Sequence, residues 1–114
     1  MRILVVGAGR AGARVIEQLQ KNPEITVITA DPREEPQAVQ EGIIPKVDIQ
    51  EVFTPLTLEF ILKEARPDMI LLAMATEDMA LGQAPGIDVL ADALREEMAA
   101  ISEIPLIVVA RGGL

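Results

Sequence analysis

Residues 3–12 read Ile3-Leu4-Val5-Val6-Gly7-Ala8-Gly9-Arg10-Ala11-Gly12, an apolar strand that passes into a helix through a GxGxxG turn. Gly7 lets the chain turn sharply, Gly9 leaves the backbone open to a pyrophosphate, and Gly12 lets the helix lie close to the sheet. Backbone N–H groups and the positive end of the helix dipole would face the phosphates. The stretch therefore predicts a nucleotide cradle built from residues 7–12.

Three neighbouring features strengthen this common glycine spacing. The motif follows four apolar residues and precedes Asp31 by 19 positions, at the end of a second expected strand over 25–29. It also opens an amphipathic helix, whose apolar face carries Ala11, Val15, Ile16 and Leu19. An acid at this distance is typical of the residue that binds the ribose hydroxyls. The alternatives are a turn acid before Pro32, or a Rossmann-shaped domain that has lost its ligand.

Length and composition limit what else the chain can do. Its 114 residues predict one domain over 1–114, too short for the cofactor and substrate domains of an ordinary dehydrogenase. The chain has no run of 18 apolar residues, so no membrane span is predicted. Residues 1–2 lead directly into a strand pattern, and no signal peptide is predicted. We therefore expect a cytoplasmic protein that does not insert into membranes.

Missing residue types exclude several kinds of chemistry. The chain has no cysteine and no histidine, which rules out disulfides, thiolate catalysis, Ser-His catalysis and histidine-bound metals. Its formal net charge of −8 disfavours nucleic acid and anionic membrane surfaces, both of which require a basic footprint. We therefore expect no metal ligands and no nucleic-acid partner.

Strand and helix patterns alternate along the rest of the chain. The remaining expected elements are a short helix over 36–41, a strand over 46–49, a helix over 56–66, a strand over 68–74, a helix over 88–101 and a strand over 104–110. Thr54-Pro55 is typical of a helix start, a side-chain cap followed by proline. The last helix is expected to bury one apolar face: Leu90, Leu94, Met98 and Ile101.

Five strands joined by right-handed crossovers predict an α/β fold, a Rossmann-like doubly wound parallel sheet in the order 3-2-1-4-5. Ligands of such sheets bind beyond the carboxyl ends of the strands, where the strand order reverses. The glycine turn and a long loop over 75–87 should therefore meet at that edge.

Four segments also carry a family resemblance: residues 7–12, Thr29-Ala30-Asp31, Ala75-Thr76-Glu77-Asp78, and residues 107–111. In them the chain resembles the RCK domains, also called KTN or TrkA-N domains, which bind nucleotides and regulate potassium channels and transporters. The resemblance implies that the glycines hold the pyrophosphate, Asp31 the ribose, and Ala75 and Thr76 the second half of the cofactor. The family's usual Gly-Asp pair at the third strand is Val47-Asp48 here, so Asp48 would have to recognise the adenine base.

The residues at the ligand edge favour NAD over the other adenine nucleotides. Arg33 is a candidate for binding the 2′-phosphate of NADP, but an acid at the end of the strand repels that group. NADP and ADP or ATP are therefore the less favoured ligands. Glu77 and Asp78 are candidates for an acid/base pair or a cation site. The favoured interpretation is that they belong to a solvated acidic loop.

Three classes of function remain open. The first is a regulatory or sensor domain that binds NAD or NADH, which by resemblance would control potassium transport. The second is a small NAD(P)-dependent oxidoreductase, or the cofactor-binding half of a split dehydrogenase. The third is a protein-interaction module without a ligand. The enzyme is disfavoured because the chain offers neither a substrate domain nor a His, Tyr or Cys proton donor, so no catalytic residue is assigned.

The last strand predicts association. In the expected strand order, residues 104–110 lie at an open edge, and they carry no lysine to discourage pairing with another chain. We therefore expect a homodimer, or a complex with a separate protein, that covers this edge or the adjacent helix over 88–101.

Overall fold

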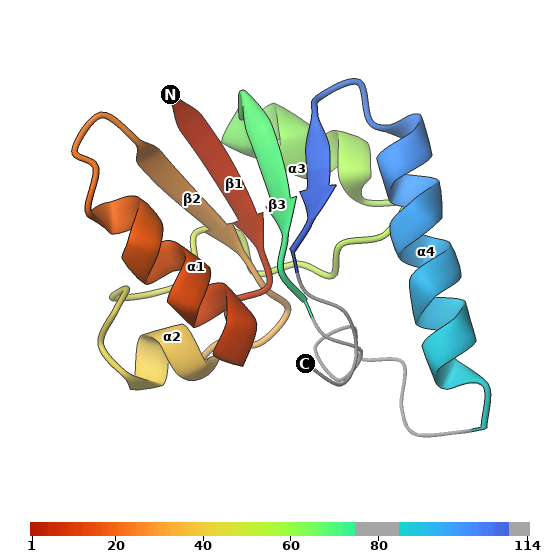
Figure 1. Ribbon diagram of the computed structural model, residues 1–114, viewed down its shortest axis with the longest axis horizontal. Coiled ribbons are helices and arrows are strands. Elements are labelled where there is room, and N and C mark those ends of the chain that lie inside the picture. The colour runs from red at the N-terminus through yellow and green to blue at the C-terminus, as the bar shows by residue number, and fades with distance from the viewer. Residues whose placement is uncertain (75–84, 110–114) are drawn as a thin grey trace.

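The computed structural model describes residues 1–74 and 85–109, which form a parallel sheet with helices on both faces (Figure 1). In chain order the elements are β1 (Arg2–Val6), α1 (Arg10–Gln20), β2 (Thr26–Ala30), α2 (Gln37–Gln40), α3 (Leu58–Ala65), β3 (Met69–Leu72), α4 (Ile87–Ile101) and β4 (Leu106–Val108). The sheet has the order β2-β1-β3-β4, and each neighbouring pair is parallel. The predicted α/β class is confirmed, and the strand order reverses between β1 and β3.

The prediction of five strands in the order 3-2-1-4-5 is wrong in its third strand. Residues 46–49 lie beside β2 as expected, but they form a single parallel bridge, from Ile49 to Ala30. The N–H of Thr29, which a longer strand would pair with a backbone carbonyl, instead donates to the Asp48 side chain at 2.9 Å. Pro45 has no N–H to extend the ladder from its other end. A side-chain acceptor has thus replaced the backbone ladder.

Each face of the sheet buries its own apolar core, because successive side chains of a strand point to opposite faces. Ile3 and Val5 of β1 pack with residues of α1 and α2, whereas Leu4 and Val6 pack with residues of α3 and α4. Figure 1 shows α1 and α2 on the near face of the sheet and α3 behind it. Burial on both faces explains the unbroken apolar run of β1.

Helix α4 buries only part of the predicted face: Met98 is buried and Leu94 packs against the core, but Leu90 and Ile101 do not. Its buried residues include Ala91, Arg95 and Met98, while Leu90 and Ile101 are 47% and 50% exposed. The buried positions follow the i, i+4, i+7 spacing of one helix face. The apolar pattern missed part of that face because a charged residue stands at its centre.

Helix α3 is shorter at both ends than the helix predicted over 56–66. The Thr54 hydroxyl accepts hydrogen bonds from the N–H groups of Leu56 and Thr57, at 3.2 and 3.3 Å, in the turn that precedes the helix. Regular helix begins only at Leu58, its N-cap is Thr57, and no side chain caps it, so the predicted cap at Thr54 is wrong. Arg66 closes the helix in the left-handed conformation, with φ 48°, directly before Pro67. Among the helices described, none is both long and apolar enough to cross a bilayer.

Candidate functional site

The glycine turn lies at the carboxyl end of β1 and places the N-terminus of α1 there. Gly7 has φ +96°, which only glycine adopts readily, and its N–H donates to the carbonyl of Ala30 at 2.8 Å. Gly9 is the N-cap residue of α1, and no side chain caps the helix. Since α1 also has no acidic residue in its first turn, no acid of that turn competes with an anionic ligand. The turn therefore offers an N-terminus suited to phosphate.

Two of the glycines are required by close backbone approach. A Cβ atom at Gly12 would lie 1.7 Å from the carbonyl oxygen of Gly7, so α1 packs directly against the turn that precedes it. A Cβ atom at Gly7 would lie 2.8 Å from the N, Cα and Cβ atoms of Met74, just beyond the end of β3. The turn is thus held between α1 and the β3 end.

Asp31 follows β2 and ties its end to the glycine turn. Its carboxylate is buried, and Oδ2 accepts the N–H of Ala8 at 2.8 Å. Arg33 fills the remaining positions: its N–H and Nε donate to Oδ1 at 2.9 and 3.0 Å, and Nη2 donates to Oδ2 at 2.9 Å. An ionised carboxylate has about four lone-pair positions. Those of Asp31 therefore all have protein donors.

Asp48 lies near the same edge but is engaged with β2. Its Oδ2 accepts both the N–H and the hydroxyl of Thr29, at 2.9 and 3.1 Å, and its own N–H donates to that hydroxyl at 3.1 Å. In the same segment, the carbonyl of Ile49 accepts the N–H of Asp31 at 3.1 Å. Asp48 thus fixes the segment after β2 beside Asp31.

The structure brings most of the predicted site residues to one edge. The carboxyl ends of β1 and β2 carry residues 7–12, Asp31 and Arg33, and Asp48 borders them. Ala75 and Thr76, together with the acids Glu77 and Asp78, lie outside the described residues. Within the ranges 1–74 and 85–109, no group of three or more His, Cys, Asp or Glu residues is arranged to hold a metal ion.

Sequence reasoning missed Arg95, a buried cation near this edge. Its Nη1 donates to Oδ1 of Asp92 at 2.7 Å, and its Nη2 donates to the carbonyl of Met74 at 3.3 Å. The available signal was an arginine within the stripe of Ala91 and Met98, where an amphipathic helix normally carries apolar residues.

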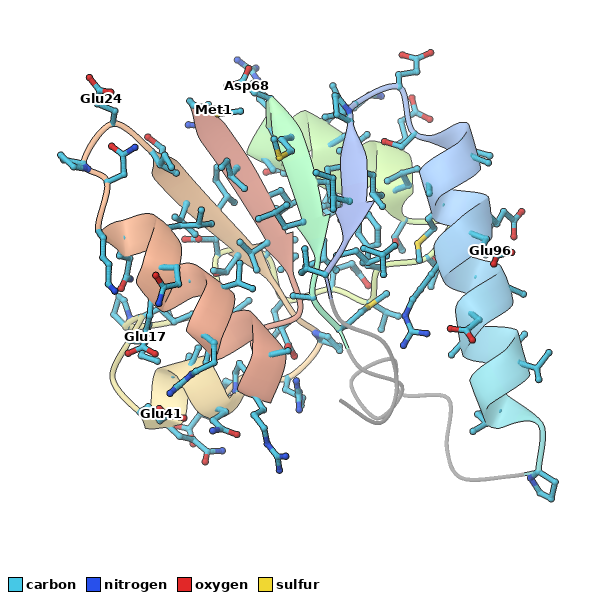
Figure 2. All side chains as sticks on the ribbon, viewed as in Figure 1. Met1, Glu17, Glu24, Glu41, Asp68 and Glu96 are labelled. Carbon is cyan, nitrogen blue, oxygen red and sulfur yellow. The ribbon has the colours of Figure 1, made fainter. Side chains whose placement is uncertain are left out.

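Surface charges also join α1 to α2. Arg14 forms ion pairs with Glu17 and Glu41, and Figure 2 shows these two acids on that side of the molecule. Hydrogen bonds from the Gln37 amide and then from Arg14 lower the pKa of Glu41 below its usual value. The ion pair with Glu41 connects the helix that follows the glycine turn to the short helix α2.

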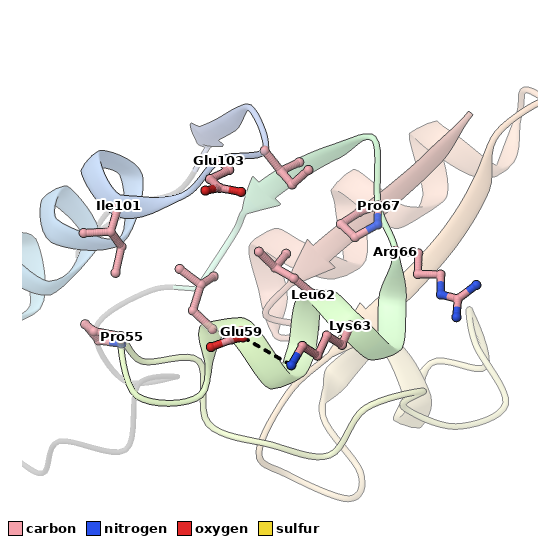
Figure 3. A pocket seen from close by; sticks show the side chains of 10 residues that line it. Pro55, Glu59, Leu62, Lys63, Arg66, Pro67, Ile101 and Glu103 are labelled. Carbon is pink, nitrogen blue, oxygen red and sulfur yellow. Dashed lines mark ion pairs between the residues drawn. The ribbon is translucent and has the colours of Figure 1, made fainter.

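A pocket of about 650 Å³ lies near the amino ends of β3 and β4, between α3 and the junction of α4 with β4 (Figure 3). Leu62, Ile101 and Ile104 supply apolar walls, and an ion pair of 3.2 Å between Lys63 and Glu59 borders it. None of the predicted site residues lines this pocket. It is therefore separate from the glycine-turn site.

One comparison with known proteins identifies a family. The family model described as TrkA-N domain matches residues 3–81, a stretch that includes the glycine turn, Asp31, Arg33 and Asp48. No curated protein matches the chain.

Proposed function

Because the chain belongs to the TrkA-N domain family, we propose that it is a regulatory domain whose ligand is NAD or NADH. The family is one of Rossmann-type nucleotide-binding domains, often found in the regulation of potassium transport. The observation that carries the proposal is the position of buried Asp31 against Ala8 of an uncapped glycine turn. This arrangement offers phosphate donors and a ribose acceptor side by side.

The pyrophosphate is assigned to the backbone of residues 7–12. The N-terminal amides of a helix lack intrahelical acceptors, and the helix dipole favours a negative charge in front of them. Neither a capping side chain nor a first-turn acid supplies that charge to α1. A phosphate group would supply it.

The ribose is assigned to Asp31, and Arg33 then has a defined role. The guanidinium places Nε on Oδ1 and Nη2 on Oδ2, so two donors approach the two carboxylate oxygens side by side. The 2′ and 3′ hydroxyls of an adenosine ribose are also two adjacent donors. We infer that they replace the Arg33 side chain, which moves aside, while the N–H of Ala8 keeps its bond to Oδ2.

This exchange also bears on the choice of nucleotide. An NAD ribose donates two hydrogen bonds to the carboxylate, whereas the 2′-phosphate of NADP brings negative charge to a buried acid. NAD or NADH is therefore favoured over NADP. ADP or ATP would use the same phosphate and ribose contacts but would leave the second half of the site without a ligand.

Substitutions at the pair should change NAD affinity in opposite directions. Asp31→Asn should weaken NAD binding by about 1–3 kcal/mol, the usual contribution of a charged hydrogen bond. Arg33→Met should strengthen binding by about 1 kcal/mol, because the ribose hydroxyls then no longer have to displace two side-chain donors from the buried carboxylate. Isothermal calorimetry with NAD measures both effects.

Arg14→Met is the matched control, since it removes an exposed arginine whose partners lie on α1 and α2, and it should leave NAD affinity unchanged. A loss of affinity on Arg33→Met as large as that on Asp31→Asn would refute the exchange. It would assign Arg33 a direct contact with the ligand.

We also propose that the chain associates through the edge formed by β4 and α4. Among the described strands β4 lies at the edge of the sheet, and two large apolar residues are exposed there, Ile107 within β4 and Val109 directly after it. Val89 and Leu90 are exposed on α4. Open edges and apolar patches of this kind are covered in many assemblies.

Multi-angle light scattering tests this association with and without NAD. We expect a dimer at micromolar concentration, and Ile107→Lys should convert it to a monomer by placing a charge at the apolar edge. Lys63→Glu, a charge change on exposed α3, should leave the dimer intact. A monomer at every concentration, with and without NAD, would refute self-association.

A further inference from the structure

Arg95 occupies a position that packing alone would give to an apolar side chain. It is 1% exposed and lies between Ala91 and Met98 on the buried face of α4. Both of these neighbours belong to the apolar core beneath α3 and α4. Burying a charge at such a position costs stability unless the group is well bonded, and an apolar residue of similar size is often equally stable or more so. An arginine at this position therefore depends on its bonded partners.

The contacts of Arg95 reach toward the candidate nucleotide site. Its Nη2 bonds the carbonyl of Met74, two residues beyond the end of β3. The backbone of Met74 in turn lies against Gly7, so closely that a Cβ on Gly7 would approach three of its atoms at 2.8 Å. Asp92, one helical turn before Arg95, holds the other end of the guanidinium.

These contacts form a continuous connection from the first glycine to α4. Met74 is buried and packs in the core with Met98 and Ala91, so it has little room to move independently of the helix. A displacement of Gly7 toward β3 would push on Met74, and the hydrogen bond would carry that shift to Arg95. A rearrangement of the turn around a phosphate would therefore act on the placement of α4.

We propose that Arg95 is a positioning residue that couples nucleotide binding at the glycine turn to α4. This inference rests on the proposed function, because it requires a nucleotide at residues 7–12. The ligand is recognised by its phosphates, and Arg95 acts through Met74 rather than by touching the ligand. By linkage, the factor by which the nucleotide stabilises the docked α4 is also the factor by which docking of α4 strengthens nucleotide binding.

Hydrogen–deuterium exchange of the whole chain, with and without NAD, tests the coupling. In the wild type, NAD should slow amide exchange in residues 91–101 at least about fivefold, the lower end of typical coupling factors. Arg95→Met should abolish this response while NAD affinity changes by no more than the same factor. Arg95→Lys keeps the charge and part of the reach, and it should retain part of the response.

Glu96→Gln is the matched control, because Glu96 is the next residue of α4 and points outward (Figure 2). It should respond to NAD as the wild type does. If Arg95→Met does not fold, the response of the wild type and the partial response of Arg95→Lys still decide the matter.

The outcomes separate the coupling from the nucleotide site itself. If NAD binds the wild type but leaves exchange in α4 unchanged, the coupling is refuted and the proposed function stands. An unchanged response in Arg95→Met, or an undiminished one in Arg95→Lys, refutes the role of Arg95. If calorimetry detects no binding of NAD, NADH, ADP or ATP to the wild type, the proposed function is refuted and the coupling with it.

Discussion

Replacing Gly12 with alanine is expected to lower the free energy of unfolding by about 3 kcal/mol, near the upper end for an overpacked site. The added Cβ would lie 1.7 Å from the carbonyl oxygen of Gly7, a backbone atom that cannot rotate away. Alanine is about 1 kcal/mol better than glycine inside a helix, so any net loss must come from this overlap. Urea unfolding followed by circular dichroism measures it.

Gly42→Ala is the control that separates overlap from backbone strain. Gly42 also has a positive φ, +75°, but a Cβ there would meet nothing within 4 Å. Its cost should be only the left-handed conformation of a non-glycine residue, about 1–2 kcal/mol. If Gly12→Ala were as stable as the wild type, α1 would not be packed against the turn as described.

Replacing Gly9 with valine should abolish nucleotide binding and preserve the fold. Gly9 has φ −77° and ψ −151°, an extended conformation with a negative φ, so glycine is not required here for a left-handed backbone. A branched side chain at this N-cap would instead occupy the space of the pyrophosphate. We expect at least a 100-fold loss of NAD affinity by calorimetry, with a loss of stability of only about 1 kcal/mol from the poorer cap.

The comparison of Gly9→Val with Gly12→Ala is informative because the two glycines lie in one turn and should fail differently. The first variant should fold without binding, and the second should lose stability. Tight NAD binding by Gly9→Val would place the phosphates elsewhere. Unfolding of Gly9→Val would show that Gly9 is required by packing.

The beginning of the fold could be predicted because local and tertiary signals agree there. Four apolar residues, the glycine spacing and the apolar face of α1 all indicate the same strand, turn and helix. The position of Asp31 followed from the length of that unit. The ion pair of Asp31 with Arg33 could not be predicted in this way, because residue spacing does not encode the geometry of side chains.

Two errors arose where a polar side chain took an unexpected role. Asp48 bonds the N–H of Thr29 and limits the third strand to one bridge. Arg95 turns inward, and the predicted face of α4 was therefore displaced toward Leu90 and Ile101, which are exposed. Hydrophobic periodicity counts apolar residues and does not detect a buried cation held by a carbonyl. In both cases the local structure depends on a hydrogen bond to a residue distant in the sequence.

The location of the nucleotide is tested most directly by NMR, with NAD titrated into uniformly ¹⁵N-labelled protein. The amide signals of residues 7–12, 31 and 33 should show the largest shifts, and those lining the pocket beside α3, such as Leu62 and Ile104, should stay unchanged. The same titration of Gly9→Val should shift none of these signals. Shifts confined to the α3 pocket, or no shift at millimolar NAD, would contradict a nucleotide site at the glycine turn.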